Sequence, residues 1–241
     1  MRAETRHSLK EDRFRVTTIE AAEKTAHWTV EHRSSLMVAA VVVAVLVAAG
    51  IGLWQYTTHQ DQLASVDFGQ AVQTMQAPIV PAGTPAQPGQ PTFTSMQDRA
   101  TAAQKQLKAI VDKYPHTRQA DFSRYFLGVT ATELGDSTSA QNYLSEVASY
   151  HNKDLAALAK LALAAVYRNT NKDAQAIDLY KQLIDKPTMT VSKVTAQMEL
   201  ASLYQAKQDS AEAKKIYEQV QKDNPTGDTA QMATQKLGEM K

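Results

Sequence analysis

The hydrophobic pattern divides the chain into an N-terminal apolar run and a long C-terminal region in which apolar residues recur with a helical period. The apolar run covers residues 36–54, LMVAAVVVAVLVAAGIGLW, and contains no charged residue and no proline. A helix of about 19 residues is about 28 Å long, close to the thickness of the hydrocarbon core of a bilayer. The run therefore predicts a single transmembrane helix over residues 35–56. A core helix buried within protein is the alternative.

The charges on either side of this run predict its orientation. The preceding segment carries a series of basic residues, namely Arg2, Arg6, Lys10, Arg13, Arg15, Lys24 and Arg33, whereas no Lys or Arg follows until Arg99. Because basic segments resist translocation, we expect a cytoplasmic arm over residues 1–34 and an exported C-terminal part. No small-residue cleavage site closely follows Trp54, so a retained signal anchor in the inner (plasma) membrane is expected. The weak apolar stripe of the arm leaves open a docking helix or a simple tail.

Small residues recur every four positions along the predicted membrane helix, at Ala40, Ala44, Ala48 and Gly52. Stripes of this kind allow two helices to approach closely in lipid. We therefore expect this face to pack on another membrane helix. The alternative is that alanine is simply common in this segment.

Two short segments follow the apolar run. Residues 57–76 predict the first helix of the exported part, with an apolar face formed by Leu63, Phe68, Ala71 and Met75. Residues 77–94 contain five prolines and predict an extended linker or insert, since proline removes backbone donors and disfavours helix before it. Proline-rich segments also bind aromatic grooves, but no charged anchor accompanies these prolines.

The remainder of the chain is helical in pattern and repeats with a spacing of 36 to 37 residues. Three stretches begin at residues 126, 161 and 198. They share a small residue (Gly128, Ala164, Ala201), a second small residue (Ala140, Ala176, Ala213) and, four positions later, a larger apolar one (Leu144, Tyr180, Tyr217). Pro187 and Pro225 follow the last two units, and Ala103 and Leu107 indicate an earlier unit.

This pattern resembles the tetratricopeptide repeat, in which Leu-Gly-x-x-Tyr is followed by Ala, an aromatic residue and Pro. The resemblance implies an all-α fold of helical hairpins stacked into a solenoid over residues 95–241, with residues 228–240 as a capping helix. The first unit is split, because its two helices lie on either side of the Pro-rich insert. A generic helical bundle is the alternative.

The order of cytoplasmic arm, anchor and exported repeats is similar to that of the bacterial ancillary subunit of the SecYEG translocon. The repeats are also similar to those of the cell-division coordinator family. The first resemblance implies an interaction adaptor whose partners are translocon subunits, periplasmic chaperones or exported clients. The second leaves open a structural scaffold for envelope assembly or cell division.

The sequence offers no catalytic pattern. The chain has no cysteine, its six histidines form no metal-ligand spacing, and no phosphate-binding loop or nucleophile motif occurs. A formal net charge of +1 gives no general attraction to nucleic acid. We therefore expect no catalytic residue, no metal, no cofactor, no small-molecule substrate and no nucleic acid partner.

The first helix of each tetratricopeptide unit lines the concave surface of the array, so the resemblance places recognition there. Positions i, i+3 and i+7 along these helices give the first-helix face: Phe122, Tyr125, Val129, Leu158, Leu161, Ala165, Met198 and Ser202, with Thr195 beside them. These side chains are largely apolar, and aromatic and Met side chains suit adaptable contacts. We expect apolar or amphipathic segments as ligands. The same periodicity also suits residues buried between helices.

Overall fold

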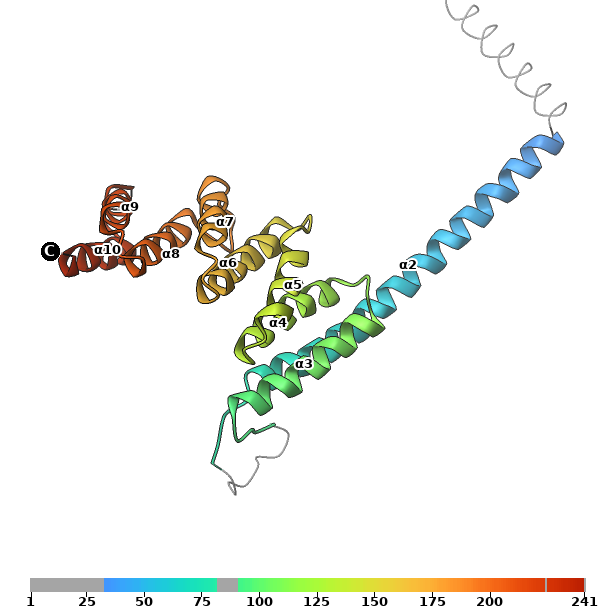
Figure 1. Cartoon of the computed structure of the whole chain (residues 1–241). Helices are drawn as coiled ribbons and strands as arrows, with labels where there is room; N and C mark the ends of the chain where they lie inside the picture. Colours follow the sequence, from blue (N-terminus) through green and yellow to red (C-terminus); the bar gives the residue numbers. More distant parts are fainter. Residues whose placement is uncertain (1–32, 82–90, 224, 241) are drawn as a thin grey trace, which may run out of the picture. The chain divides into compact units, whose positions relative to one another are not determined.

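A computed structural model describes residues 33–81, 91–223 and 225–240, and every regular element in these ranges is a helix (Figure 1). The chain divides into two compact units, residues 1–58 and residues 59–241. The helix α2 (Arg33–Met75) contributes its first part to one unit and its last part to the other. The apolar stripe expected in the cytoplasmic arm lies outside the described residues.

The N-terminal part of α2 has the composition expected of a membrane span. It contains a window of mean hydropathy 2.8, and no residue of this window is buried within the chain. Among the described residues, this is the one helix that is long and apolar enough to cross a bilayer. Membrane insertion would cover its exposed Val and Leu side chains, which water would not solvate well.

The short helix expected after the apolar run is the C-terminal part of α2, with no break between the two segments. Its buried face begins at Ala64 and continues through Phe68, Ala71 and Met75. Leu63, which the sequence grouped with these residues, lies outside the buried face and is 40 % exposed. Successive helical residues are about 100° apart, so Leu63 lies well to the side of the stripe that starts one residue later.

Eight further helices follow within residues 91–223 and 225–240, and side-chain caps fix where most of them begin. They are α3 (Met96–Lys113), α4 (Arg118–Glu133), α5 (Ser137–Ala148), α6 (Lys153–Asn169), α7 (Asp173–Asp185), α8 (Lys193–Ala206), α9 (Ser210–Asp223) and α10 (Asp228–Glu239). Side-chain oxygens of Ser95, Thr117, Asp136, Asn152 and Ser192 each accept a backbone N–H at a helix start. Such a cap stabilises a helix by about 1 kcal/mol.

The small residues of the repeat lie where the two helices of each hairpin approach each other. All of the repeated small and larger apolar residues are buried: Gly128, Ala164, Ala201, Ala140, Ala176, Ala213, Leu144, Tyr180 and Tyr217. In the hairpin of α4 and α5 the approach leaves no room for a larger residue, because a Cβ added at Gly128 would lie 2.5 Å from Leu144 Cγ. The repeat of 36 to 37 residues is therefore a repeat of helix packing.

The turn inside each hairpin also recurs with the same geometry. At the equivalent position of each turn, one residue has a left-handed backbone conformation: Gly135 (φ 78°), Asn171 (φ 55°) and Gln208 (φ 62°). The residue after each turn donates a backbone hydrogen bond five positions back, as in Asp136 N to Ala131 O at 2.9 Å. This bond satisfies a carbonyl at the helix end, in the manner of a Schellman motif. In the next two hairpins, the backbone carbonyl oxygens of Tyr167 and Tyr204 accept the equivalent hydrogen bonds.

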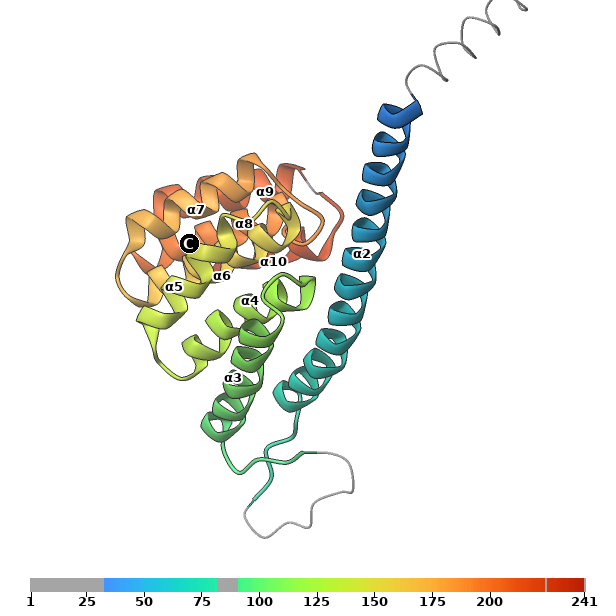
Figure 2. The same ribbon diagram turned by 90° about the vertical axis from the view of Figure 1, so that its right-hand side faces the viewer.

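The two ends of the Pro-rich insert lie side by side. Val80 N donates to Phe93 O at 2.8 Å, and Phe93 N donates to Pro78 O at 3.2 Å. Ala77 O accepts from Arg99 Nη1 at 3.4 Å. Since both ends of the insert meet at the base of α3, α2 and α3 form a hairpin despite the intervening residues (Figure 2).

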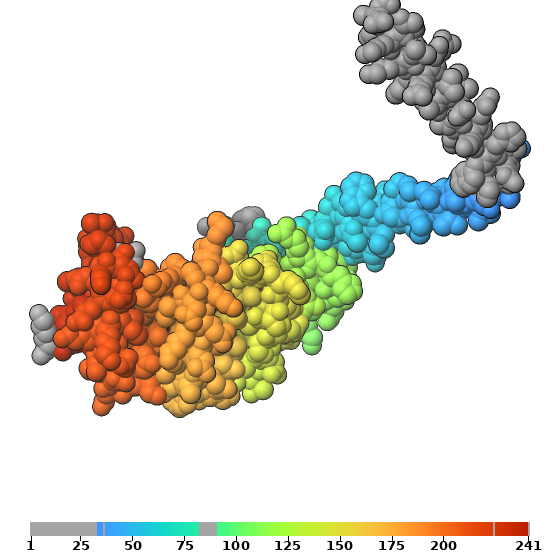
Figure 3. Space-filling model, turned by 90° about the horizontal axis from the view of Figure 1, so that it is seen from above, coloured from blue at the N-terminus to red at the C-terminus, as the bar shows by residue number. Residues whose placement is uncertain are grey.

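Successive hairpins stack in sequence order (Figure 3), and buried clusters lie between them. One cluster joins α2, α3 and α4 through Ala64, Leu107 and Leu127. Others join α4 to α6, α6 to α8, and α8 to α10. The prediction of an all-α, tetratricopeptide-like array of hairpins is confirmed.

Candidate functional site

The first helices α4, α6 and α8 carry the predicted first-helix face, and none of its large apolar side chains is fully buried. Phe122, Tyr125, Val129, Leu158, Leu161, Ala165 and Met198 are all half-buried, whereas Thr195 and Ser202 are exposed. The face therefore presents partly accessible apolar side chains and, toward α8, polar ones.

Most of these apolar side chains also contribute to the core. Phe122 and Tyr125 pack against the cluster between α4 and α6, and Met198 packs against the last cluster. The Phe122 ring lies 6.3 Å from that of Phe68, which ties α4 to α2. Burial raises the pKa of the Tyr125 phenol, consistent with its half-covered position. Substituting these residues would therefore disturb both the surface and the packing.

Val129 differs from the rest of the first-helix face because it lines a pocket, and it belongs to none of the buried clusters described above. The pocket has a volume of about 200 Å³ and lies where three helices meet. Its walls come from α2, α3 and α4, with Val72, Met75, Gln76, Arg99, Ala100, Ala103, Phe126, Val129, Thr130 and Glu133 as lining residues. A volume of this size admits one or two large apolar side chains of a partner rather than a whole ligand molecule.

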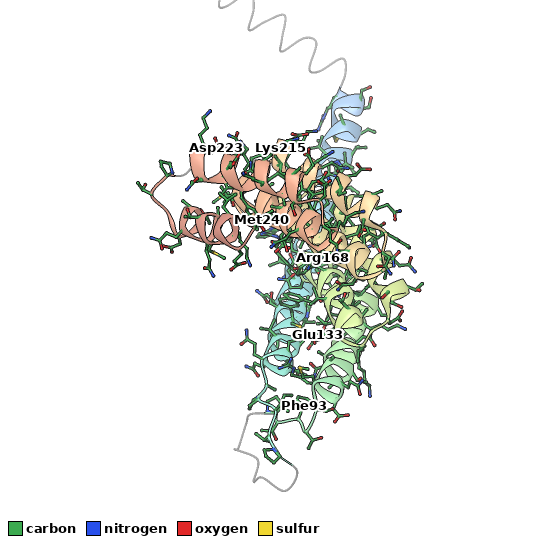
Figure 4. All side chains as sticks on the ribbon, turned by 60° about the vertical axis from the view of Figure 1, so that its left-hand side comes forward. Phe93, Glu133, Arg168, Lys215, Asp223 and Met240 are labelled. Carbon is green, nitrogen blue, oxygen red and sulfur yellow. The ribbon has the colours of Figure 1, made fainter. Side chains whose placement is uncertain are left out.

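Two charged groups border this mainly apolar pocket. Arg99 is half-buried and donates to a backbone carbonyl, while Glu133 is exposed on α4 (Figure 4). Arg99 has no carboxylate partner among the described residues. An apolar cavity with polar groups at its rim is typical of protein sites that accept an anchoring side chain.

An ion-pair network holds α4 against α5 next to the first-helix face. The largely buried Arg124 guanidinium lies 3.2 Å from Asp121 Oδ1 and 3.3 Å from Glu146 Oε1. The Tyr150 hydroxyl donates to Glu146 at 2.8 Å, and desolvation together with this hydrogen bond raises the pKa of Tyr150 to about 12. All of these groups have partners within the chain. The network therefore supports the fold and leaves recognition to the apolar positions.

The sequence pattern missed most of the pocket. Steps of four from Phe122 reach Phe126 and Thr130, so the helical period did contain a signal for the α4 wall. The walls supplied by α2 and α3 depend on closure of the Pro-rich insert, which no local pattern encodes. Among the described residues, no group of His, Asp and Glu is arranged to hold a metal ion. His59, His116 and His151 are exposed.

Comparison with known families agrees with this architecture. A family described as "Tetratricopeptide repeat-like domain" matches residues 26–182, which is more than half of the chain and includes the apolar run. A second family, described as "Tetratricopeptide repeat", matches residues 195–227, the hairpin of α8 and α9. No curated protein and no solved structure matches the chain. Repeats of this kind are typically non-catalytic modules for protein–protein interaction. The chain belongs to the tetratricopeptide repeat-like domain family.

Proposed function

We propose that this protein is a membrane-anchored adaptor of the bacterial cell envelope, in which the repeat array holds a protein partner near the Sec translocon or during handling of exported polypeptides. A repeat array implies a protein partner, since stacked hairpins create an extended surface for binding. The partners proposed are translocon subunits, periplasmic chaperones or exported clients.

The anchor is supported by the composition of α2 and by the charges around it. The helix contains an exposed window of mean hydropathy 2.8. Seven Lys or Arg residues precede this window, and the next basic residue is Arg99. Charge asymmetry of this kind favours retention of the N-terminus in the cytoplasm and export of the repeats. The family match also begins before the apolar run and extends into the repeats, so one match covers both.

The observation that carries the binding proposal is the pocket at the N-terminal end of the first-helix face. Val129 connects the two, because it belongs to the face and also lines the pocket. A partner segment lying along the face would place one apolar side chain in the pocket and others against Tyr125 and Leu161. Half-buried apolar side chains lose little additional entropy on binding, because packing already restricts them.

Site-specific photo-cross-linking tests this assignment without disturbing the core. A photo-reactive residue is placed at Val129 or at the exposed Ser202, and the matched control is the exposed Glu218 on the second helix α9. We expect protein adducts from Val129 and Ser202 and none from Glu218. Adducts at Glu218 alone would place the binding surface on the second helices and refute the proposal.

The identity of the cross-linked proteins distinguishes an adaptor for protein export from a structural scaffold. Translocon subunits, chaperones or exported chains support the proposed role. Cell-division or wall-synthesis proteins would replace it with the structural scaffold. Because the same cross-linked bands are analysed by mass spectrometry, the location of the site and the class of partner are decided in one experiment.

The membrane helix offers a second, independent contact. The small-residue face at Ala40, Ala44, Ala48 and Gly52 is exposed within the chain, and no atom lies near a Cβ built at Gly52. Leucine at Ala44 and Ala48 would keep the helix apolar but prevent close approach of another helix. We expect these variants to insert normally and to recover less of the membrane partner on co-purification. Unchanged recovery would exclude this face as a contact.

A further inference from the structure

The part of α2 that belongs to the array has a second face that nothing in the described chain covers. Its buried face packs on α3 and α4 through Ala64, Phe68 and Ala71. The second face is exposed and consists of His59, Leu63, Val66, Gln70 and Gln73. Leu63 is 40 % exposed and Val66 is 62 % exposed. We call these five residues the α2 seam.

The α2 seam has the spacing of a coiled-coil stripe. Its members are separated by four, three, four and three residues, which is the spacing of a and d positions in a heptad. The apolar members, Leu63 and Val66, lie in the middle and are followed by glutamines.

The α2 seam is also uncharged, although 21 % of the chain's residues are charged. The nearest acidic residues, Asp61 and Asp67, lie off the seam. Asp67 accepts a hydrogen bond from Tyr114 at 3.0 Å and lies 3.6 Å from Lys113, so its charge is engaged within the array. In a parallel, in-register pair each residue meets its own copy, and a charge in the seam would face a like charge.

We propose that the α2 seam is covered by the α2 seam of a second copy of this chain, in a parallel pair. The inference rests on the proposed membrane anchor, because two copies inserted in one orientation present their α2 helices in parallel. Leu63 and Val66 form the apolar centre of the contact, and His59 and Gln70 each offer a donor and an acceptor to their counterparts. A seam of about two heptads is weak in solution, but confinement to one membrane raises the effective concentration of the second copy.

Disulfide scanning tests the pair directly, since the natural chain contains no cysteine and each variant carries a single thiol. Single cysteines are placed in the full-length protein at Leu63, Val66 and Gln70, with the exposed, off-seam Asp61 and Ser65 as matched controls. After oxidation of native membranes, we expect a dimer of the chain from the three seam positions and little from the controls. Equal cross-linking at all five positions, or none at any, would overturn the proposal.

A charge variant provides the second measurement. Lysine at Val66 leaves the fold intact because this side chain is exposed. It should lower dimer formation by the Gln70→Cys protein roughly tenfold, which corresponds to about 1.4 kcal/mol of repulsion. Ser65→Lys is the matched control and should leave dimer formation unchanged. An unchanged yield with Val66→Lys would refute the seam.

The outcomes also separate this inference from the proposed function. Membranes are first washed with alkaline carbonate, and a chain that is washed out lacks the anchor, so that both the function and the parallel pair fail. If the chain stays in the washed membranes but its seam cysteines form disulfides with a different protein, only the proposed pair is overturned. In that case the photo-cross-links from Val129 still test the adaptor role, because Val129 lies on α4 and not in the α2 seam.

Discussion

The close approach of α4 and α5 at Gly128 makes a quantitative prediction about the array. The change is Gly128→Ala, whose Cβ would lie 2.5 Å from Leu144 Cγ and 2.7 Å from Leu144 Cδ2. The Leu144 side chain is completely buried and cannot turn into solvent. Alanine in a helix interior gains about 1 kcal/mol over glycine, whereas overpacking a tight core costs about 1–3 kcal/mol. We expect the variant to be less stable by about 1 kcal/mol.

The matched control is Gly69→Ala in α2, where a Cβ would meet no atom within 4 Å. This variant gains the helix propensity without a clash and should be more stable by up to about 1 kcal/mol. Urea unfolding of the detergent-solubilised protein, followed by circular dichroism, compares the free energies of unfolding of the two variants with that of the wild type. The two substitutions should shift the urea midpoint in opposite directions.

A double-mutant cycle identifies the cause of the loss. Leu144→Ala alone removes buried methyl groups and costs about 2–5 kcal/mol. In that background Gly128→Ala no longer meets the leucine, so it should become neutral or stabilising, with a coupling energy of about 1–3 kcal/mol. Additive effects of the two substitutions, or a Gly128→Ala protein as stable as the Gly69→Ala control, would refute the argument from helix approach.

Further predictions concern topology, buried hydroxyls and the hairpin turns. A cysteine that replaces Ser8 should be shielded from a membrane-impermeant reagent in intact cells. A cysteine that replaces the exposed Thr138 should react once the outer layer is permeabilised. Labelling at Ser8 and protection at Thr138 would contradict the proposed orientation. Tyr180→Phe should be neutral or stabilising by up to about 1 kcal/mol in urea unfolding, because the buried hydroxyl has no hydrogen-bond partner among the described residues. Tyr217→Phe, at the equivalent position of the next hairpin, loses a hydrogen bond of 3.3 Å and should be destabilising; equal effects of the two would exclude this account. Burial raises the pKa of Tyr180 to about 12, so folding stability should fall as the pH rises from about 10 through this value, and Tyr180→Phe should remove part of that fall. Gln208→Gly should raise the free energy of unfolding by about 1 kcal/mol, because Gln208 has a positive φ that glycine adopts without strain; a lower urea midpoint would contradict this.

Periodic features of the fold could be predicted from the sequence. The repeat of Ala140, Ala176 and Ala213 at 36 to 37 residues identified the hairpin unit, because close packing of two helices requires a small residue at the same place in each copy. The apolar run indicated a membrane helix for a similarly local reason, since its length and composition need no distant contact. Helix starts were also local, because Ser95 and Thr117 cap their helices with their own side chains.

The face of α2 was decided by tertiary contacts. Leu63 and Ala64 are neighbours in sequence, and hydrophobicity favours Leu63 for the core, yet Ala64 is buried and Leu63 is exposed. Ala64 lies in the buried cluster with Leu107 and Ile110 of α3, and a single-helix pattern contains no information about which side of α2 meets that helix.

The candidate site likewise combines a local and a non-local part. The helical period placed Val129 on the first-helix face, but the pocket next to it also requires Met75 and Arg99. These residues meet only because the backbone bonds between Val80, Phe93 and Pro78 close the Pro-rich insert and bring α2 beside α3. Sequence by itself therefore determined the helices, their repeat and the apolar run, since each depends on neighbouring residues. Tertiary structure decided which side chains remain accessible, because accessibility depends on how closely separate helices approach.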